Sequence, residues 1–179
     1  TISDVERPKK YKDSKWSKEL QVRSELLSKF HGRDVFQKAA IIVPQSYFND
    51  RARRYPVLIT IPGFSGEHYT ARRDRPVPEN NPGGVEFIRV ILNPSCPLGH
   101  HVFADSANNG PHGRCLIEEF IPALDKAFRT ISKPSARFLT GHSSGGWSSL
   151  WLQVSYPEHF RSEERRVGKE CRSRWSPYH

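Results

Sequence analysis

The pentapeptide Gly-His-Ser-Ser-Gly at positions 141–145 constrains the fold of this chain more than any other stretch. A short, partly apolar run, residues 137–140, precedes it. Behind it, apolar side chains recur at helical spacing, at Trp147, Leu150, Trp151 and Val154. This pattern predicts a strand, a sharp turn and a helix, and small residues at both ends of the turn leave room for the two flanking elements. The sequence therefore favours an α/β protein.

Ser143 lies at the centre of the predicted turn and is the candidate catalytic nucleophile. A serine held between a strand and a helix projects its hydroxyl from the edge of the sheet. The N–H group of the next residue, Ser144, then faces a developing oxyanion, and His142 is expected to line the pocket. The alternative is an ordinary Gly-Ser turn. The strand and helix predicted on either side favour the catalytic interpretation.

A second glycine-rich loop, residues 62–66, follows a largely apolar run, residues 57–61, that is typical of a buried strand. Glycines directly after a central strand allow backbone N–H groups to face a ligand, as an oxyanion hole requires. We expect Phe64 to supply the second N–H donor, and Gly63 and Ser65 to line the pocket. An ordinary strand-ending turn is the alternative.

A long polar loop, residues 93–111, follows another predicted strand, residues 87–92. Loops at this end of the strands of α/β proteins carry pocket residues, so we expect Asp105, Asn108 and Asn109 to line the pocket. The same three side chains could coordinate calcium or hydrogen-bond their own turn, and the turn is favoured over calcium.

No metal and no cofactor are expected. The cysteines and histidines around the long loop have no recognised zinc-ligand spacing. These residues are Cys96, His100, His101, His112 and Cys115.

Two further segments complete the predicted architecture. Residues 20–27 and 35–43 are strand candidates joined by a turn, which predicts an N-terminal antiparallel hairpin. Residues 114–129 form an amphipathic helical pattern, and Pro122 inside it predicts a kink.

Charge and length exclude some function classes. The chain has 179 residues, which suits one domain, and a formal charge of +9. Lys and Arg are spread along the chain among acidic residues and no nucleic-acid-binding signature accompanies them, so no nucleic-acid partner is expected. No apolar run approaches the roughly 20 residues of a membrane span.

Taken in order, three groups of motifs resemble the esterase D-like ("putative esterase") family of α/β-hydrolases. They are Tyr-Pro-Val at 55–57 with the loop at 62–66, Phe-Ile-Pro at 120–122, and the pentapeptide followed by Tyr-Pro-Glu-His-Phe at 156–160. The resemblance implies a doubly wound, mostly parallel sheet behind the N-terminal hairpin. It also implies hydrolysis of small-molecule or carbohydrate-linked carboxylic esters or thioesters through an acyl-enzyme on Ser143. Phe64 and Ser144 match the family's oxyanion-hole positions.

The chain departs from the family after the third motif. The family's acid and histidine follow the nucleophile, but residues 161–179 are basic and have no strand pattern. We expect residues 1–160 to be the N-terminal part of an α/β-hydrolase domain that is incomplete at its C-terminus, and residues 161–179 to be a foreign-looking, disordered basic tail. The histidines that precede the nucleophile on loops, His68, His100 and His101, are alternative bases outside the family's order.

A chain without the triad acid and histidine is expected to be nearly inactive, since losing the base lowers turnover by a factor on the order of 10⁶. An acyltransferase of the same fold and a non-catalytic basic interaction module are the alternative functions. The family resemblance favours a secreted or periplasmic location.

Overall fold

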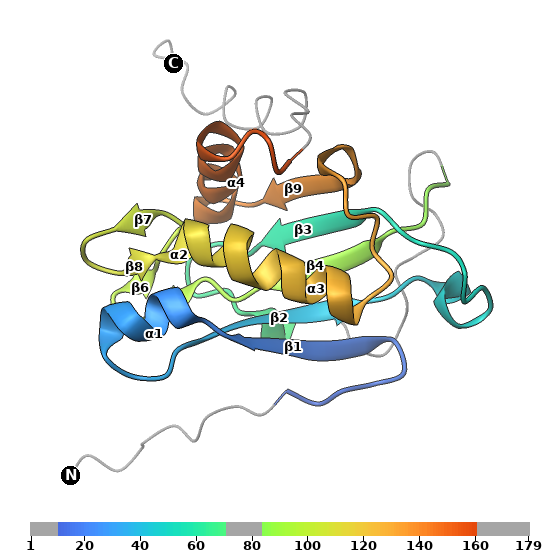
Figure 1. Ribbon diagram of the computed structural model, residues 1–179, viewed down its shortest axis with the longest axis horizontal. Helices are drawn as coiled ribbons and strands as arrows, with labels where there is room; N and C mark the ends of the chain where they lie inside the picture. Colours follow the sequence, from blue (N-terminus) through green and yellow to red (C-terminus); the bar gives the residue numbers. More distant parts are fainter. Residues whose placement is uncertain (1–10, 71–83, 161–179) are drawn as a thin grey trace, which may run out of the picture.

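The computed structural model describes residues 11–70 and 84–160, which form a mixed five-stranded sheet with helices packed on it (Figure 1). The strand order is β1-β2-β4-β3-β9. The pairs β1·β2 and β2·β4 are antiparallel, whereas β3 lies parallel to both β4 and β9. The strands are β1 (Ser17–Arg23), β2 (Phe36–Ile42), β3 (Val57–Ile61), β4 (Ile88–Leu92) and β9 (Arg137–Gly141).

The predicted N-terminal pairing is confirmed, but the strand predicted over residues 20–27 is wrong beyond Arg23. The connection between β1 and β2 is a helix, α1 (Glu25–His31), instead of a simple turn. Ser24 caps it by accepting a hydrogen bond from the Leu27 N–H at 3.0 Å. Gly32, with φ 63°, ends it in the left-handed conformation. A helix of two turns contains too few apolar residues for their periodicity to distinguish it from a strand.

The predicted helix over residues 114–129 is a helical run in three parts. It consists of α2 (His112–Arg114), a π-helical turn labelled η3 (Cys115–Phe120) and α3 (Ile121–Ala127). Pro122, where a kink was predicted, lies in the first turn of α3 directly after the π-helical turn. The predicted apolar face is buried through Leu116, Ile117, Phe120, Ile121 and Leu124.

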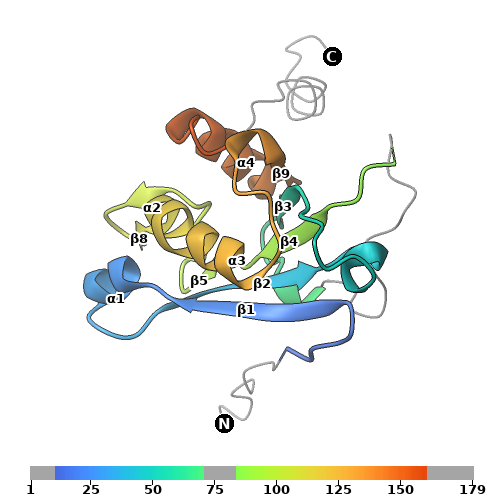
Figure 2. The ribbon, with the colours of Figure 1, turned by 45° about the vertical axis from the view of Figure 1, so that its right-hand side comes forward.

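The main core lies between one face of the sheet and the helices α3 and α4 (Ser144–Ser155). Figure 2 shows these helices and the sheet from a second direction. Alternate residues of the parallel strands, such as Val57, Ile59 and Val90, point into it. A smaller cluster of Ala40, Ile42 and Ile91 lies apart from this core, with Tyr11 and Phe87 packed on it.

The helix predicted after the pentapeptide is confirmed as α4, but its apolar face points away from the sheet. Trp147, Leu150 and Val154 are 51%, 49% and 71% exposed. The helix instead buries a face of small residues and one leucine, namely Gly145, Ser148, Ser149 and Leu152. Small residues are needed there because α4 begins against the end of β3.

The predicted strands over residues 57–61 and 87–92 are β3 and β4. The long loop after β4 contains two small antiparallel hairpins. They are β5 (Ser95–Cys96) with β6 (Gly99–His100), and β7 (Asp105–Ser106) with β8 (Gly110–Pro111).

Three short 3-10 helices connect the larger elements: η1 (Gln45–Phe48), η2 (His68–Thr70) and η4 (Pro134–Ala136). None of the helices in residues 11–70 and 84–160 is long and apolar enough to cross a membrane. The predicted basic tail, residues 161–179, lies outside the described residues.

Candidate active site

Ser143 occupies a strained turn between β9 and α4. Its backbone has φ 56° and ψ −126°, a combination that is uncommon for any residue other than glycine. Hydrogen bonds of 2.9 Å close the turn, from the Gly145 N–H to the His142 carbonyl and from the Gly146 N–H to the Ser143 carbonyl. The side chain of Ser143 is exposed at the carboxyl end of β9.

The glycines on either side of Ser143 allow this turn to form. A Cβ atom at Gly141 would lie 2.2 Å from the carbonyl carbon and oxygen of Gly145. A Cβ atom at Gly145 would lie 2.0 Å from the carbonyl oxygen of Ile61, the last residue of β3. The turn is therefore packed tightly against the neighbouring strand as well as against itself.

The loop after β3 lies directly beside Ser143. Ile61 pairs with Gly141, so the parallel strands β3 and β9 end at the same edge of the sheet. A Cβ atom at Gly63 would lie 3.1 Å from the His142 carbonyl oxygen and 3.5 Å from the Ser143 Cβ. The fold thus brings together the two loops that were expected from the sequence to line one pocket.

A tight turn shapes the loop after β3. The Gly66 N–H donates to the Gly63 carbonyl at 2.9 Å, and Ser65 has φ 60°. Within the described residues, neither the Phe64 N–H nor the Ser144 N–H makes a hydrogen bond. Two free N–H groups near a serine hydroxyl can stabilise the oxyanion of a tetrahedral intermediate. That Phe64 and Ser144 form such a hole stays a prediction.

The predicted pocket residues of the long loop lie on the β7–β8 hairpin. One carboxylate oxygen of Asp105 accepts from the Arg114 N–H at 3.0 Å, and the other accepts from the Tyr156 hydroxyl. Asp105 therefore ties the start of the α2 helical run to the end of α4. Asn108 is exposed and Asn109 half-buried. The pocket role of these three residues stays a prediction.

The histidines proposed as alternative bases make hydrogen bonds to other groups. His68 Nε2 lies 2.7 Å from Glu19 Oε1, and burial lowers the pKa of His68. His100 Nε2 lies 2.9 Å from the Pro62 carbonyl oxygen. Nδ1 of His101 accepts from the Phe103 N–H at 3.1 Å. Among the described residues, no histidine nitrogen hydrogen-bonds the Ser143 hydroxyl.

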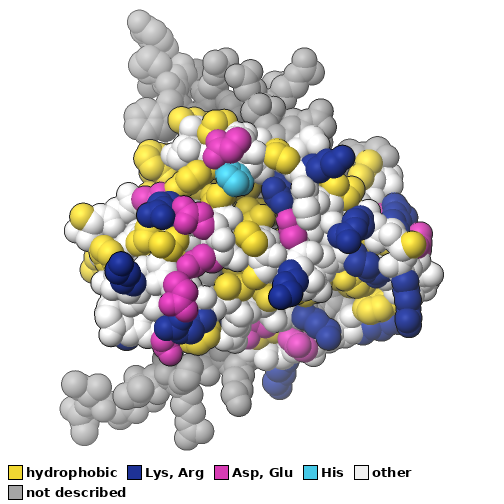
Figure 3. Space-filling view, in the orientation of Figure 1, with side chains coloured by type: hydrophobic (Ala, Val, Ile, Leu, Met, Phe, Trp, Pro, Cys, Tyr) yellow, Lys and Arg dark blue, Asp and Glu magenta, His cyan; other side chains and the backbone are white. Residues whose placement is uncertain are grey.

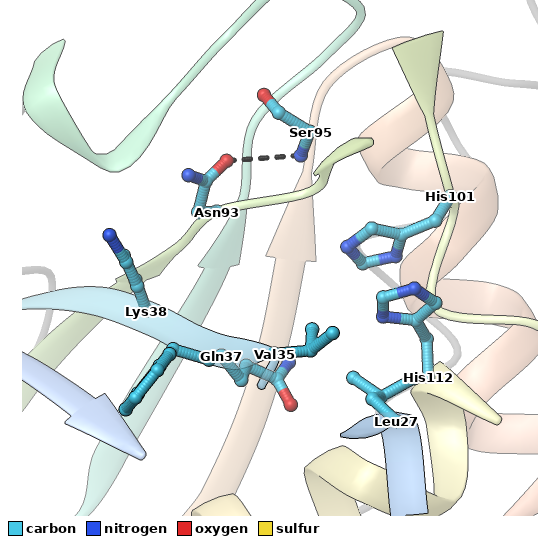
Figure 4. A pocket seen from close by; sticks show the side chains of 9 residues that line it. Leu27, Val35, Gln37, Lys38, Asn93, Ser95, His101 and His112 are labelled. Atoms are coloured by element: carbon cyan, nitrogen blue, oxygen red, sulfur yellow. Dashed lines mark hydrogen bonds between the residues drawn. The ribbon is translucent and has the colours of Figure 1, made fainter. Parts of the chain in front are cut away.

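A separate cleft of about 70 Å³ lies beside two stacked histidines (Figure 4). The rings of His101 and His112 are parallel, with centroids 3.6 Å apart. Burial is the main cause that lowers the pKa of His112 to about 4, and it holds that of His101 well below the usual value. The other residues lining the cleft are Leu27, Val35, Phe36, Gln37, Lys38, Asn93 and Ser95. Ser143 is not among them.

The cleft contains no candidate metal centre. In the part of the chain that the structure describes, no three histidine, cysteine or carboxylate side chains are placed to hold a metal ion. Cys96 and Cys115 are both free thiols, and burial raises the pKa of Cys115 to about 12.

The contact between His100 and Pro62 is a feature of the site that sequence analysis missed. It joins the hairpin β5–β6 to the loop after β3, and the two segments are far apart in the chain. No local motif signals such a contact.

Part of the chain matches the model of a known protein family. Residues 103–163 match the family model described as "Putative esterase". No curated protein matches the chain.

Solved structures with the same fold include three hydrolases. The ferulic acid esterase of Anaeromyces mucronatus has a TM-score of 0.61 and 18% identity over 85% of this chain and 58% of that one. An S-formylglutathione hydrolase from Agrobacterium tumefaciens has a TM-score of 0.60 and 16% identity over 82% of this chain and 55% of that one. The fluorophosphonate-binding serine hydrolase F of Staphylococcus aureus has a TM-score of 0.59 and 20% identity over 80% of this chain and 53% of that one.

This chain thus spans a little over half the length of each of these three proteins. Their likeness confirms the predicted α/β-hydrolase fold, here with a mixed sheet.

Proposed function

We propose that this chain, which matches an esterase family over residues 103–163 and has an α/β-hydrolase fold, carries the nucleophile and the oxyanion-binding groups of a serine esterase. The contact between the two loops at the sheet edge supports this proposal most directly. Gly63 adjoins Ser143 closely enough that a Cβ atom on it would lie 3.5 Å from the serine Cβ. This contact supports the N–H of the next residue, Phe64, as a donor to the oxyanion.

The proposed reaction is acyl transfer from an ester to Ser143. The hydroxyl oxygen of Ser143 bonds to the carbonyl carbon of the ester while its proton leaves to a base. The negative oxygen of the tetrahedral intermediate accepts hydrogen bonds from the N–H groups of Phe64 and Ser144. The bond to the leaving alcohol then breaks, the alcohol takes up a proton, and water later hydrolyses the acyl-enzyme to the acid and free Ser143.

The described residues supply little help for the proton transfers in this scheme. Their histidines hydrogen-bond or stack elsewhere, apart from His142, which is exposed and adjoins Ser143 in the chain. Without a positioned base, turnover falls by a factor on the order of 10⁶, while an oxyanion hole and binding retain roughly 10³ to 10⁴ over water. We therefore propose that this chain acylates slowly.

Fluorophosphonate labelling tests the proposal. The full chain is incubated with the probe, and intact-mass analysis followed by peptide mapping locates the adduct. We expect slow labelling of Ser143, none in Ser143→Ala, and wild-type labelling in Ser155→Ala, a matched change at an exposed position of α4. A folded wild-type chain that stays unlabelled, or is labelled at another serine, contradicts the proposal.

A further inference from the structure

His100 ends the strand β6 and reaches across to the loop after β3. Its Nδ1 accepts a hydrogen bond from the Val102 N–H at 3.0 Å, so the ring proton of the neutral imidazole is on Nε2. Nε2 lies 2.9 Å from the Pro62 carbonyl oxygen, which can only accept. The Nε2–H group of His100 therefore donates to Pro62.

The carbonyl of Pro62 is also in contact with the turn that holds the nucleophile. A Cβ atom at Gly145 would lie 2.7 Å from the Pro62 oxygen. This oxygen thus lies between the ring of His100 and the first turn of α4. Its position determines the plane of the peptide that joins Pro62 to Gly63, one residue before the proposed Phe64 donor.

A second contact joins the same hairpin to the same loop. Gly99 has φ 107°, and a Cβ atom built on it would lie 2.8 Å from Cε2 of the Phe64 ring. The Phe64 side chain is 71% exposed, so the backbone of Gly99 supports one side of an otherwise open ring. Successive residues of β6 therefore hold the loop at Pro62 and at Phe64.

We infer that His100 is a positioning residue for the oxyanion hole: its hydrogen bond to the Pro62 carbonyl sets the direction of the Phe64 N–H. The inference rests on the proposed function of the Ser143 site. Without this hydrogen bond the Pro62–Gly63 peptide would be free to shift and to move the Gly63 Cα, to which the next peptide with its Phe64 N–H is joined. Such donors act only when they are aimed before the reaction begins. His100 does not touch the reacting atoms, because its Nε2–H is directed at Pro62.

Three variants of the full chain test this role. His100→Phe keeps a ring but removes the donor. His100→Gln keeps an N–H donor at a similar reach. His159→Phe is the matched control, since His159 follows α4 and contacts Glu158 and Tyr156.

The first readout is the rate of fluorophosphonate labelling of Ser143. We expect His100→Phe to slow it about tenfold, because a small misplacement of a positioning group is enough for such a loss. His100→Gln should recover most of the rate, and His159→Phe should match the wild type. Equal rates in wild type and His100→Phe would overturn the inference.

The second readout does not depend on activity. Labelling with ¹⁵N-phenylalanine gives at most ten amide signals, and Phe64→Leu identifies that of Phe64. We expect this signal to shift in His100→Phe and to stay near its wild-type position in His100→Gln and His159→Phe. A folded His100→Phe protein with an unshifted Phe64 signal would refute the positioning role.

The outcomes separate the two proposals. A wild-type chain that does not label contradicts the proposed function alone, and the Phe64 signal still decides the role of His100. If His100→Phe does not fold, long-range ¹H–¹⁵N spectra of the wild-type histidines decide instead. A His100 ring protonated on Nδ1 would be incompatible with the inferred hydrogen bond.

Discussion

Single residues determine whether the turn at Ser143 can form. The serine adopts φ 56°, and the residues two positions away on either side are glycines in very close contact with backbone atoms. Gly141 contacts Gly145, and Gly145 contacts the end of β3. The next glycine, Gly146, is different, because a Cβ atom there would meet its nearest neighbour, the Gly141 oxygen, at 3.4 Å.

This difference gives a matched pair of substitutions. Gly145→Ala should lower the free energy of unfolding by about 1–3 kcal/mol, as expected when extra volume enters a packed site. Gly146→Ala should leave stability unchanged or raise it by up to about 1 kcal/mol, since alanine favours a helix. Urea denaturation followed by circular dichroism measures both. Equal effects of the two substitutions would contradict the contact with Ile61.

At the scale of elements, the strands and helices around the site were predictable where the signal was local. The apolar run of β3 and the strand, turn and helix around Ser143 were predicted from their own residues. The cap residues of α1, Ser24 and Gly32, were also present in the sequence, but residues 20–27 were assigned to a strand. A capping serine followed by glycine after a short interval was the signal that could have identified this helix.

The buried face of α4 could not be predicted from periodicity. Spacing places Trp147, Leu150, Trp151 and Val154 on one stripe, and such stripes usually face the core. Here the first turn of α4 lies so close to the end of β3 that even a Cβ atom at Gly145 would clash, and the stripe is directed outwards. Contacts between loops, such as that of His100 with Pro62, depend on tertiary structure in the same way.

The stacked rings of His101 and His112 join two segments of the chain, and their low pKa values predict that the stability of the fold depends on pH. His112 opens α2, and His101 lies in the segment after β6. After burial, His31 disfavours the charge of His112, whereas a hydrogen bond with the Asn109 backbone and the charge of Asp105 favour it. Because the pKa of His112 is about 4 in the folded protein and near 6.5 when unfolded, protonation favours the unfolded chain.

The stability contributed by neutral His112 is therefore present above pH 6.5 and is lost as the pH falls toward 4. The loss should be about 3 kcal/mol, and the low pKa of His101 acts in the same direction. Urea titrations between pH 7 and pH 4 measure it. His112→Gln should flatten this dependence. A stability that does not fall over this range in the wild type would contradict the buried, uncharged state of the pair.

At the scale of the whole molecule, two neighbouring surfaces favour self-association. The outward stripe of α4 is exposed, and Figure 3 shows apolar side chains at the surface in that region. Trp147 and Trp151 stack on each other there, with ring centroids 5.7 Å apart. Within the described residues, β9 is an edge strand with β3 as its partner on one side. Apolar patches and open edges of this kind promote association.

A charged residue on the stripe should reduce this association. Val154→Glu changes a side chain that is 71% exposed, so the free energy of unfolding should move by no more than about 0.5 kcal/mol. Sedimentation velocity over a range of concentrations should show fewer dimers and larger species than in the wild type. Val85→Glu, at another exposed valine, should leave the distribution unchanged. Equal behaviour of the two variants would exclude α4 as the associating surface.

The parallel pairing of β3 with β9 also has a consequence for the order of folding. Ser143 can adopt its strained turn only when Gly145 rests on the end of β3, a strand made much earlier in the chain. Closing so long a loop is slow compared with forming a local helix or hairpin. During refolding, Ser143 should therefore become reactive among the last events, after α1 and the pairing of β1 with β2. The reactivity of Ser143 would then report that β9, the last strand in the chain order, has joined the sheet.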